Sequence, residues 1–123
     1  MFEIRVEKTI ACAHQLFGYN GPCEKLHGHN YRVEVALRGT ELDEFGMLED
    51  FTVVKLAFNA ILDELDHEYL NDLPAFKGLS PSAENIAAYV YREMKSRGKF
   101  QRGKVHQVSV WETPTQVAVY SED

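Results

Sequence analysis

Two stretches of strictly alternating side chains constrain the fold of this chain more than any other feature. Side chains of residues 2–14 divide between a largely apolar face and a polar face, and the apolar face ends in His14. Residues 27–37 repeat the pattern, with His27 and His29 leading the apolar face. Because successive side chains of a strand point to opposite faces, each stretch predicts a half-buried strand.

The two predicted strands carry three histidines to one place. In an antiparallel hairpin, the end of the first strand lies beside the start of the second, so His14 should meet His27 and His29 on the same face. Two adjacent buried imidazoles would otherwise each need their own hydrogen-bond partner. Three imidazoles with an open fourth position are the ligand set of a catalytic zinc ion, so we predict Zn²⁺, although ligand type alone also permits iron, nickel or copper.

Cys23 lies in the predicted loop between these strands, four residues before His27. As a fourth ligand it would close the shell and make a purely structural zinc site. Off the metal, its thiolate would be favoured by the nearby cation and by an imidazolium such as His67, and it could act in catalysis. The residues leave both alternatives open. Cys12 is interpreted as a small buried hydrophobe.

The rest of the chain predicts two helices followed by two strands. Asp50 is a plausible N-cap for a helix whose apolar stripe runs from Phe51 to Leu65. Ser80-Pro81 signals a second helix start, and Gly98 a stop. Strands are predicted at residues 104–112 and 116–120. The order ββααββ predicts an α+β fold in one domain, residues 1–123, with an antiparallel four-stranded sheet and both helices on one face.

Composition narrows the possible partners. The 123 residues carry a formal net charge of −6, which argues against nucleic acid. No apolar run reaches the length of a membrane span, and the N-terminus is charged too early for a signal peptide, so we expect a cytoplasmic protein without membrane contact. The two cysteines are expected to be reduced thiols. The outer strands of an open sheet need covering, which suggests oligomerisation.

Two further features are weak evidence of function by themselves. Asp66 beside His67 is typical of a carboxylate that orients a general acid or base, but equally of a polar helix end. Glu112 ends a predicted strand on the face of Val108 and Val110, where a solvated charge is the simplest interpretation. His106 has no identifiable partner.

Taken in order, several motifs resemble one family. They are Ala13-His14, Cys23-x3-His27-Gly28-His29, the segment 46–51 (GMLEDF), the segment 65–71 (LDHEYLN) and Trp111-Glu112-Thr113. Together they resemble the 6-pyruvoyl tetrahydropterin synthase family, and most closely its bacterial 6-carboxytetrahydropterin synthase branch. The resemblance runs nearly end to end. Pro81-Ser82 is a small departure from the Pro-Thr of many relatives, and it keeps the hydroxyl.

The resemblance implies a fold, an assembly and residue roles. The fold is the tunnelling fold (T-fold), whose trimers close their sheets into a barrel and stack into a homohexamer. By the same resemblance His14, His27 and His29 hold zinc, and Cys23 is the catalytic base. Asp66 and His67 complete a relay, which can serve a neighbouring subunit. Glu112 accepts two hydrogen bonds from the pterin and takes no part in holding zinc.

The activity implied is that of a zinc-dependent lyase of queuosine biosynthesis. It converts 7,8-dihydroneopterin triphosphate to 6-carboxy-5,6,7,8-tetrahydropterin, acetaldehyde and triphosphate. The alternative product is 6-pyruvoyl tetrahydropterin, formed without carbon–carbon cleavage. The short spacing between Cys23 and His27 favours the carboxy branch. A competing hypothesis from another class is a non-catalytic zinc-stabilised binding module, in which Cys23 is the fourth ligand.

Overall fold

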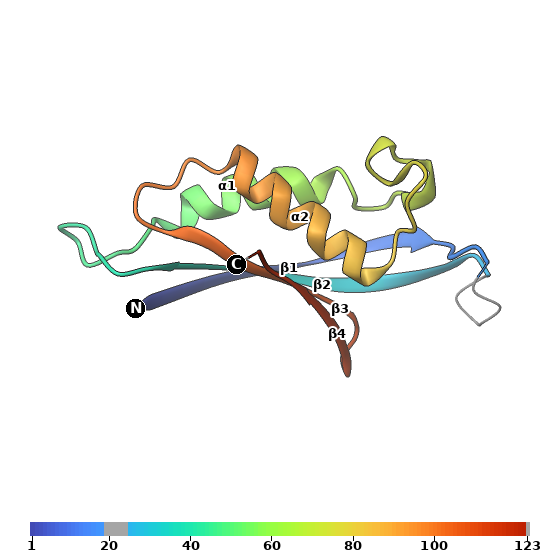
Figure 1. Cartoon of the computed structure of the whole chain (residues 1–123), viewed down its shortest axis with the longest axis horizontal. Coiled ribbons are helices and arrows are strands. Elements are labelled where there is room, and N and C mark those ends of the chain that lie inside the picture. Colours follow the sequence, from blue (N-terminus) through green and yellow to red (C-terminus); the bar gives the residue numbers. More distant parts are fainter. Residues whose placement is uncertain (19–24, 123) are drawn as a thin grey trace.

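A computed structural model describes residues 1–18 and 25–122 of the chain. Its four strands and two α-helices follow the predicted order ββααββ (Figure 1). They are β1 (Phe2–His14), β2 (His27–Gly39), α1 (Phe51–Asp63), α2 (Ala83–Arg97), β3 (Lys104–Thr113) and β4 (Gln116–Tyr120). Within the described ranges, no helix is both long and apolar enough to cross a membrane.

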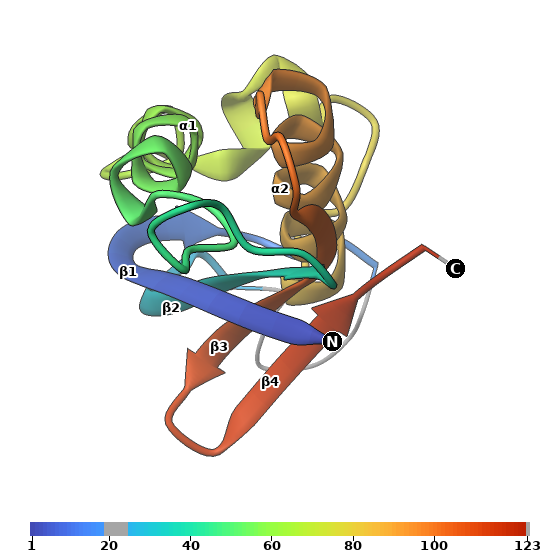
Figure 2. The same ribbon diagram turned by 90° about the vertical axis from the view of Figure 1, so that its left-hand side faces the viewer.

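The strands form one antiparallel sheet in the order β1-β2-β3-β4. Both α-helices lie on the same face of this sheet, and no helix of the described residues lies on the other face (Figures 1 and 2). The predicted α+β architecture is therefore confirmed. Between β2 and β3 the register shifts at Ala36 and Leu37, which is where a bulge interrupts the pairing.

The hydrophobic core lies between the sheet and the helices. Alternate residues of β2, from Tyr31 to Leu37, are fully buried under the helices, as the period-two pattern predicts. On α1 the buried side chains are Val54, Phe58, Ile61 and Leu62. Phe51 is half exposed, contrary to expectation, because the stripe that meets the core begins one turn later.

The helix ends follow from local hydrogen bonds. The Asp50 carboxylate accepts the Thr52 N–H at 2.8 Å, so its predicted capping role is confirmed. The second helix begins later than the Ser80-Pro81 signal suggested. Its N-cap is Ser82, whose hydroxyl accepts the Asn85 N–H, and Gly98 ends it as expected.

The segment after α1 is attached to the outer edge of β1. Backbone N–H groups of His67 and Ala13 donate to the carbonyls of Ala11 and Glu68, respectively. The Asn71 side chain then bonds both backbone groups of Gln15 at 2.9 Å. Two short 3₁₀ helices, Leu70–Asp72 and Pro74–Phe76, follow where the sequence indicated only a connection. This attachment closes part of an otherwise open sheet edge.

A buried carboxylate ties the loop before β3 to the start of α1. Glu49 is 8% exposed and accepts backbone N–H groups from Gln101, Arg102 and Gly103 at 2.5–3.1 Å. Burial by itself would raise the pKa of Glu49, but these three donors outweigh it, so the pKa is lowered.

We therefore predict that Glu49→Gln lowers the free energy of unfolding at neutral pH by roughly 1–3 kcal/mol, because a buried donor loses its charged acceptor. A group whose folded pKa is lowered stabilises the fold above its unfolded pKa, and this contribution disappears as pH falls through the folded pKa. The difference in the free energy of unfolding between Glu49→Gln and the parent should therefore become smaller below about pH 4.5. Urea unfolding at several pH values tests this, with Glu44→Gln on the exposed turn as control. An equal gap at all pH values would contradict the role of the ionised carboxylate.

Candidate metal centre

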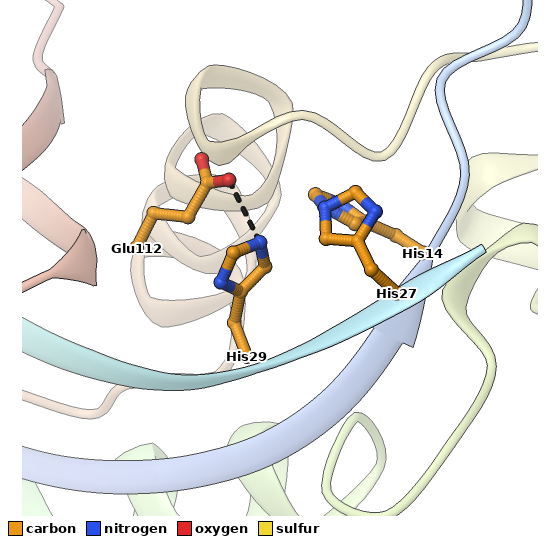
Figure 3. Close-up of side chains that lie close together, drawn as sticks. All are labelled: His14, His27, His29 and Glu112. Atoms are coloured by element: carbon orange, nitrogen blue, oxygen red, sulfur yellow. Dashed lines mark hydrogen bonds and ion pairs between the residues drawn. The ribbon is translucent and has the colours of Figure 1, made fainter. Parts of the chain in front are cut away.

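The β1–β2 hairpin brings the three predicted histidines together. His14, the last residue of β1, pairs directly with His27, the first residue of β2. His29 lies two residues along β2 and therefore on the same face. Figure 3 shows the three rings converging, and Glu112 of β3 joins them. The candidate ligand atoms of these four residues all lie within 4.8 Å of one another, so the group could hold a metal ion.

Hydrogen bonds to backbone carbonyls fix the tautomers of two of these rings. His14 Nδ1 lies 2.8 Å from the Pro81 carbonyl, and His27 Nδ1 lies 2.7 Å from the Lys25 carbonyl. Because a carbonyl can only accept, each Nδ1 must donate, which leaves the lone pair on Nε2. The two Nε2 atoms are 2.8 Å apart. When both rings are neutral their Nε2 lone pairs face each other, an arrangement that a bound cation would stabilise, and the Tyr31 hydroxyl lies 3.2 Å from His14 Nε2 as well. Imidazoles oriented by backbone carbonyls are typical of metal ligands.

His29 presents a third nitrogen to the same space. Its Nε2 atom is buried and makes no hydrogen bond within the described part of the chain. Glu112 Oε1 approaches that atom to 2.9 Å, but not with hydrogen-bond geometry. A buried nitrogen left in this state fits a metal ligand better than a structural core histidine. The donor set, three imidazoles and a carboxylate, suits Zn²⁺.

Burial keeps two of the rings in their ligating form. Desolvation lowers the pKa of His14, with the nearby His27 adding to the effect, while the Pro81 carbonyl and Glu112 oppose it. Desolvation also lowers the pKa of His29 against the opposing charge of Glu112. The Tyr31 ring lies edge-on to His14 and His29, with centroid separations of 5.8 and 5.3 Å, and helps to hold both rings in place. The neutral rings of His14 and His29 are therefore favoured at physiological pH.

Glu112 belongs to this group, which the sequence did not indicate. The apolar alternation of β3 correctly places its side chain on the core face. Its proximity to His29 depends on β3 pairing with β2, where Trp111 lies opposite Arg32. The sequence contains no signal for that register, because two helices separate the strands.

A small cavity opens beside Glu112, between the start of α2 and β4. Its volume is about 180 Å³. It is lined by Ala83, Glu84, Glu112, Gln116, Val117 and Ala118. Glu112 therefore belongs both to the lining of this cavity and to the histidine group.

Asp66 and His67 lie outside the four-residue group. His67 Nδ1 is 3.1 Å from Asp66 Oδ1, and the same oxygen accepts the Ala11 N–H at 2.9 Å. The Ala11 N–H, with His67 contributing, lowers the pKa of Asp66. His67 has a φ of 60°, its side chain is 81% exposed, and it borders a shallow cavity of about 460 Å³ that His29 also lines. A left-handed non-glycine residue held this way is typical of functional sites.

The two cysteines remain to be placed. Cys23 falls outside the described residues, so its position relative to the metal group stays a prediction. Cys12 is buried as expected, and burial raises the pKa of its thiol to about 12, which keeps it protonated and unreactive.

Fold and site together define a class: an α+β domain whose sheet carries a histidine-rich group that could hold a metal ion, beside a small cavity. Residues 3–123 match the model of the 6-pyruvoyl tetrahydropterin synthase family. The chain belongs to this family, and it is a pterin-synthase-type enzyme with the T-fold.

Individual relatives cover nearly the whole chain. It is 36% identical to the 6-carboxy-5,6,7,8-tetrahydropterin synthase of Synechocystis, over 98% of this chain and 93% of the relative. It is 32% identical to the enzyme of that name from Bacillus subtilis, over 97% and 84%. The solved structure of 6-pyruvoyl tetrahydropterin synthase from Caenorhabditis elegans superimposes with a TM-score of 0.88 at 28% identity, covering 99% of this chain and 96% of the other.

We predict that His29→Ala loses bound metal, because one of three nitrogen ligands is removed. Protein purified without chelator should contain about one zinc ion per chain, and the variant should retain little after dialysis. His106→Ala, on β3 but outside the group, is the matched histidine control and should keep its metal. Elemental analysis of the parent, His29→Ala and His106→Ala measures the zinc content of each protein. A parent protein that neither contains zinc nor takes it up would contradict the assignment.

Proposed function

We propose that this enzyme is a zinc-dependent lyase acting on 7,8-dihydroneopterin triphosphate. Its products are 6-carboxy-5,6,7,8-tetrahydropterin, acetaldehyde and triphosphate, with water consumed. The observation that carries the proposal is the 2.8 Å separation of the Nε2 atoms of His14 and His27, beside the buried His29 Nε2, which makes no hydrogen bond within the described chain. The names of the Synechocystis and Bacillus relatives support the carboxy product. In cells this would be an early cytoplasmic step towards queuosine.

Each part of the metal centre has a distinct task in this proposal. His14, His27 and His29 hold Zn²⁺, and the carbonyls of Pro81 and Lys25 keep two of the rings in the ligating tautomer. The metal ion supplies Lewis acidity, which makes the C–H and O–H groups of the substrate side chain more acidic.

Glu112 recognises the pterin ring in this account. A pterin presents its amino group and a ring N–H side by side, and an ionised carboxylate offers two acceptors at a matching spacing. The cavity of about 180 Å³ supports this role, because the Glu112 side chain forms part of its lining.

Cys23 and His67 transfer protons in the proposed reaction. Cys23 removes a proton from the substrate side chain as general base. Asp66 orients His67, and their 3.1 Å separation supports this pairing. The high exposure of His67 supports its acting across a subunit boundary, on a site that contains the neighbour's Cys23.

Incubation with 7,8-dihydroneopterin triphosphate and mass analysis of the products tests the function. Acetaldehyde and a 6-carboxylated pterin are the expected result. Cys23→Ala should keep its zinc and lose turnover by at least about 10²-fold, because a general base has been removed.

Three other outcomes of this experiment would each contradict part of the proposal. A 6-pyruvoyl product without acetaldehyde would assign the alternative synthase reaction. Loss of zinc from Cys23→Ala would indicate that the Cys23 thiol is a zinc ligand. Unchanged substrate with a full zinc load would favour the non-catalytic binding module.

The sheet edges support a homohexamer. Segment 66–71 covers the edge of β1 only over residues 11–15, and nothing in the described chain pairs with the outer edge of β4. Val117 and Val119 on β4 are about half exposed. Trimers that continue the sheet from β4 to the β1 strand of a neighbour, stacked in pairs, would satisfy both edges.

We predict that light scattering at micromolar concentration gives the mass of six chains. The physical reason is the set of unpaired backbone groups along β1 and β4, which a neighbouring copy can satisfy. A proline in the middle of β4, Ala118→Pro, should dissociate the assembly because proline removes a backbone donor. Ser121→Pro, just beyond the strand, is the control. A monomeric parent would contradict both the hexamer and a shared active site.

A further inference from the structure

The outer edge of β1 is occupied at its C-terminal end. The backbone N–H of Ala11 donates to Asp66 Oδ1 at 2.9 Å, and the Ala11 carbonyl accepts the His67 N–H. The Ala13 N–H and both backbone groups of Gln15 are bonded to residues 68–71 in the same manner. Segment 66–71 therefore closes this edge to any other strand from Ala11 onwards.

The free part of the edge begins at Thr9. Both backbone groups of alternate residues point outward from an antiparallel edge strand, so Thr9 and then Glu7 are the next outward residues before Ala11. Neither has a backbone partner on that side within residues 1–18 and 25–122. A strand from another copy can therefore pair as far as Thr9. A shift of two more residues would require the groups of Ala11, which are already bonded.

The outer edge of β4 offers a strand that fits there. All neighbouring strands of the sheet are antiparallel, so β4 runs opposite to β1 and can continue the sheet into another copy. Val117 and Val119 are 48% and 53% exposed, and they alternate with Ala118 and Tyr120, which pack against the core. The two valines therefore lie on the helix-free face.

Side-chain faces restrict the possible registers further. Thr9 and Glu7 also lie on the helix-free face, because they alternate with the core residues Val6 and Ile10. Residues directly opposite each other in a sheet share a face, so the contact between copies can shift only in steps of two residues.

We propose that segment 66–71 sets the register of the contact between copies, with Val117 of one copy opposite Thr9 of the next and Val119 opposite Glu7. This register leaves no outward group unpaired between β4 and the segment. A shift of two residues towards the N-terminus would place both valines opposite charged side chains, those of Glu7 and Arg5, and would leave Thr9 unpaired. The inference rests on the proposed assembly.

This register also brings His67 to a cavity of the next copy. Gln116 comes opposite Ile10, one residue from Ala11, which holds the His67 backbone. Gln116 also lines the cavity of about 180 Å³. The His67 side chain, which is 81% exposed, thus lies beside that cavity of the neighbouring copy. A site that uses both is incomplete in a single chain.

Cysteine cross-linking of the full-length protein tests the register. Opposite residues have Cα atoms about 4.5–5.5 Å apart, within the reach of a disulfide. Thr9→Cys/Val117→Cys and Glu7→Cys/Val119→Cys should therefore each convert most chains to a covalent trimer on mild oxidation, seen by non-reducing electrophoresis and reversed by reductant. All these positions are exposed, so the substitutions leave the core intact.

The matched controls use the same face with the register displaced by two residues. In Glu7→Cys/Val117→Cys the Cα atoms would be about 7–8 Å apart, beyond the usual disulfide range, so most chains should stay uncross-linked. The single-cysteine variants, which keep both native cysteines, should give no covalent trimer.

Each failure has a distinct meaning. Preferential cross-linking of the displaced pair would overturn the register and leave the assembly intact. A hexamer by light scattering in which neither pair cross-links would overturn the contact between β4 and β1. A monomer would overturn the proposed assembly as well. None of these results bears on the product analysis that tests the proposed reaction.

Discussion

The register of the β1–β2 hairpin is the constraint on which the rest of this structure depends. Pairing of His14 with His27 sets three imidazoles on the helix-covered face. A slip of one residue would turn the histidines of one strand to the opposite face. The buried side of each strand prevents such a slip, because it would expose Tyr31 and the valines that follow it. The packing of the core and the geometry of the metal centre are therefore fixed by the same pairing.

Much of the hairpin and of the histidine group could be predicted from the sequence, because the alternation of apolar and polar residues shows which face of a strand each side chain occupies. The hairpin, the convergence of the three histidines and the core-side position of Glu112 all follow from alternation. Contacts between segments distant in the sequence could not be predicted this way. The Pro81 carbonyl that orients His14 lies just before the second helix, and the approach of Glu112 to His29 depends on the β2–β3 register. The later start of α2 has a local cause instead, because the Ser82 hydroxyl accepts the Asn85 N–H and caps the helix there.

The segment after α1, which contains His67, is attached to β1, the strand that ends in His14. Its bonds to the edge of β1, from Ala11 to Gln15, hold His67 in a left-handed conformation that is costly for a residue with a side chain. Asp66 contributes through the Ala11 N–H as well as through His67, so its carboxylate is a backbone anchor in addition to a partner for the imidazole. The backbone at His67 is thereby held in place against β1. The place of Cys23 in that site remains a prediction.

Diffraction from crystals of the zinc-loaded protein at the zinc absorption edge tests the central claim most directly. The account predicts an anomalous peak bounded by the Nε2 atoms of His14, His27 and His29, at about 2.0–2.1 Å from each. A peak elsewhere, ligation through Nδ1, or three histidines bonded to one another with no metal peak would contradict it.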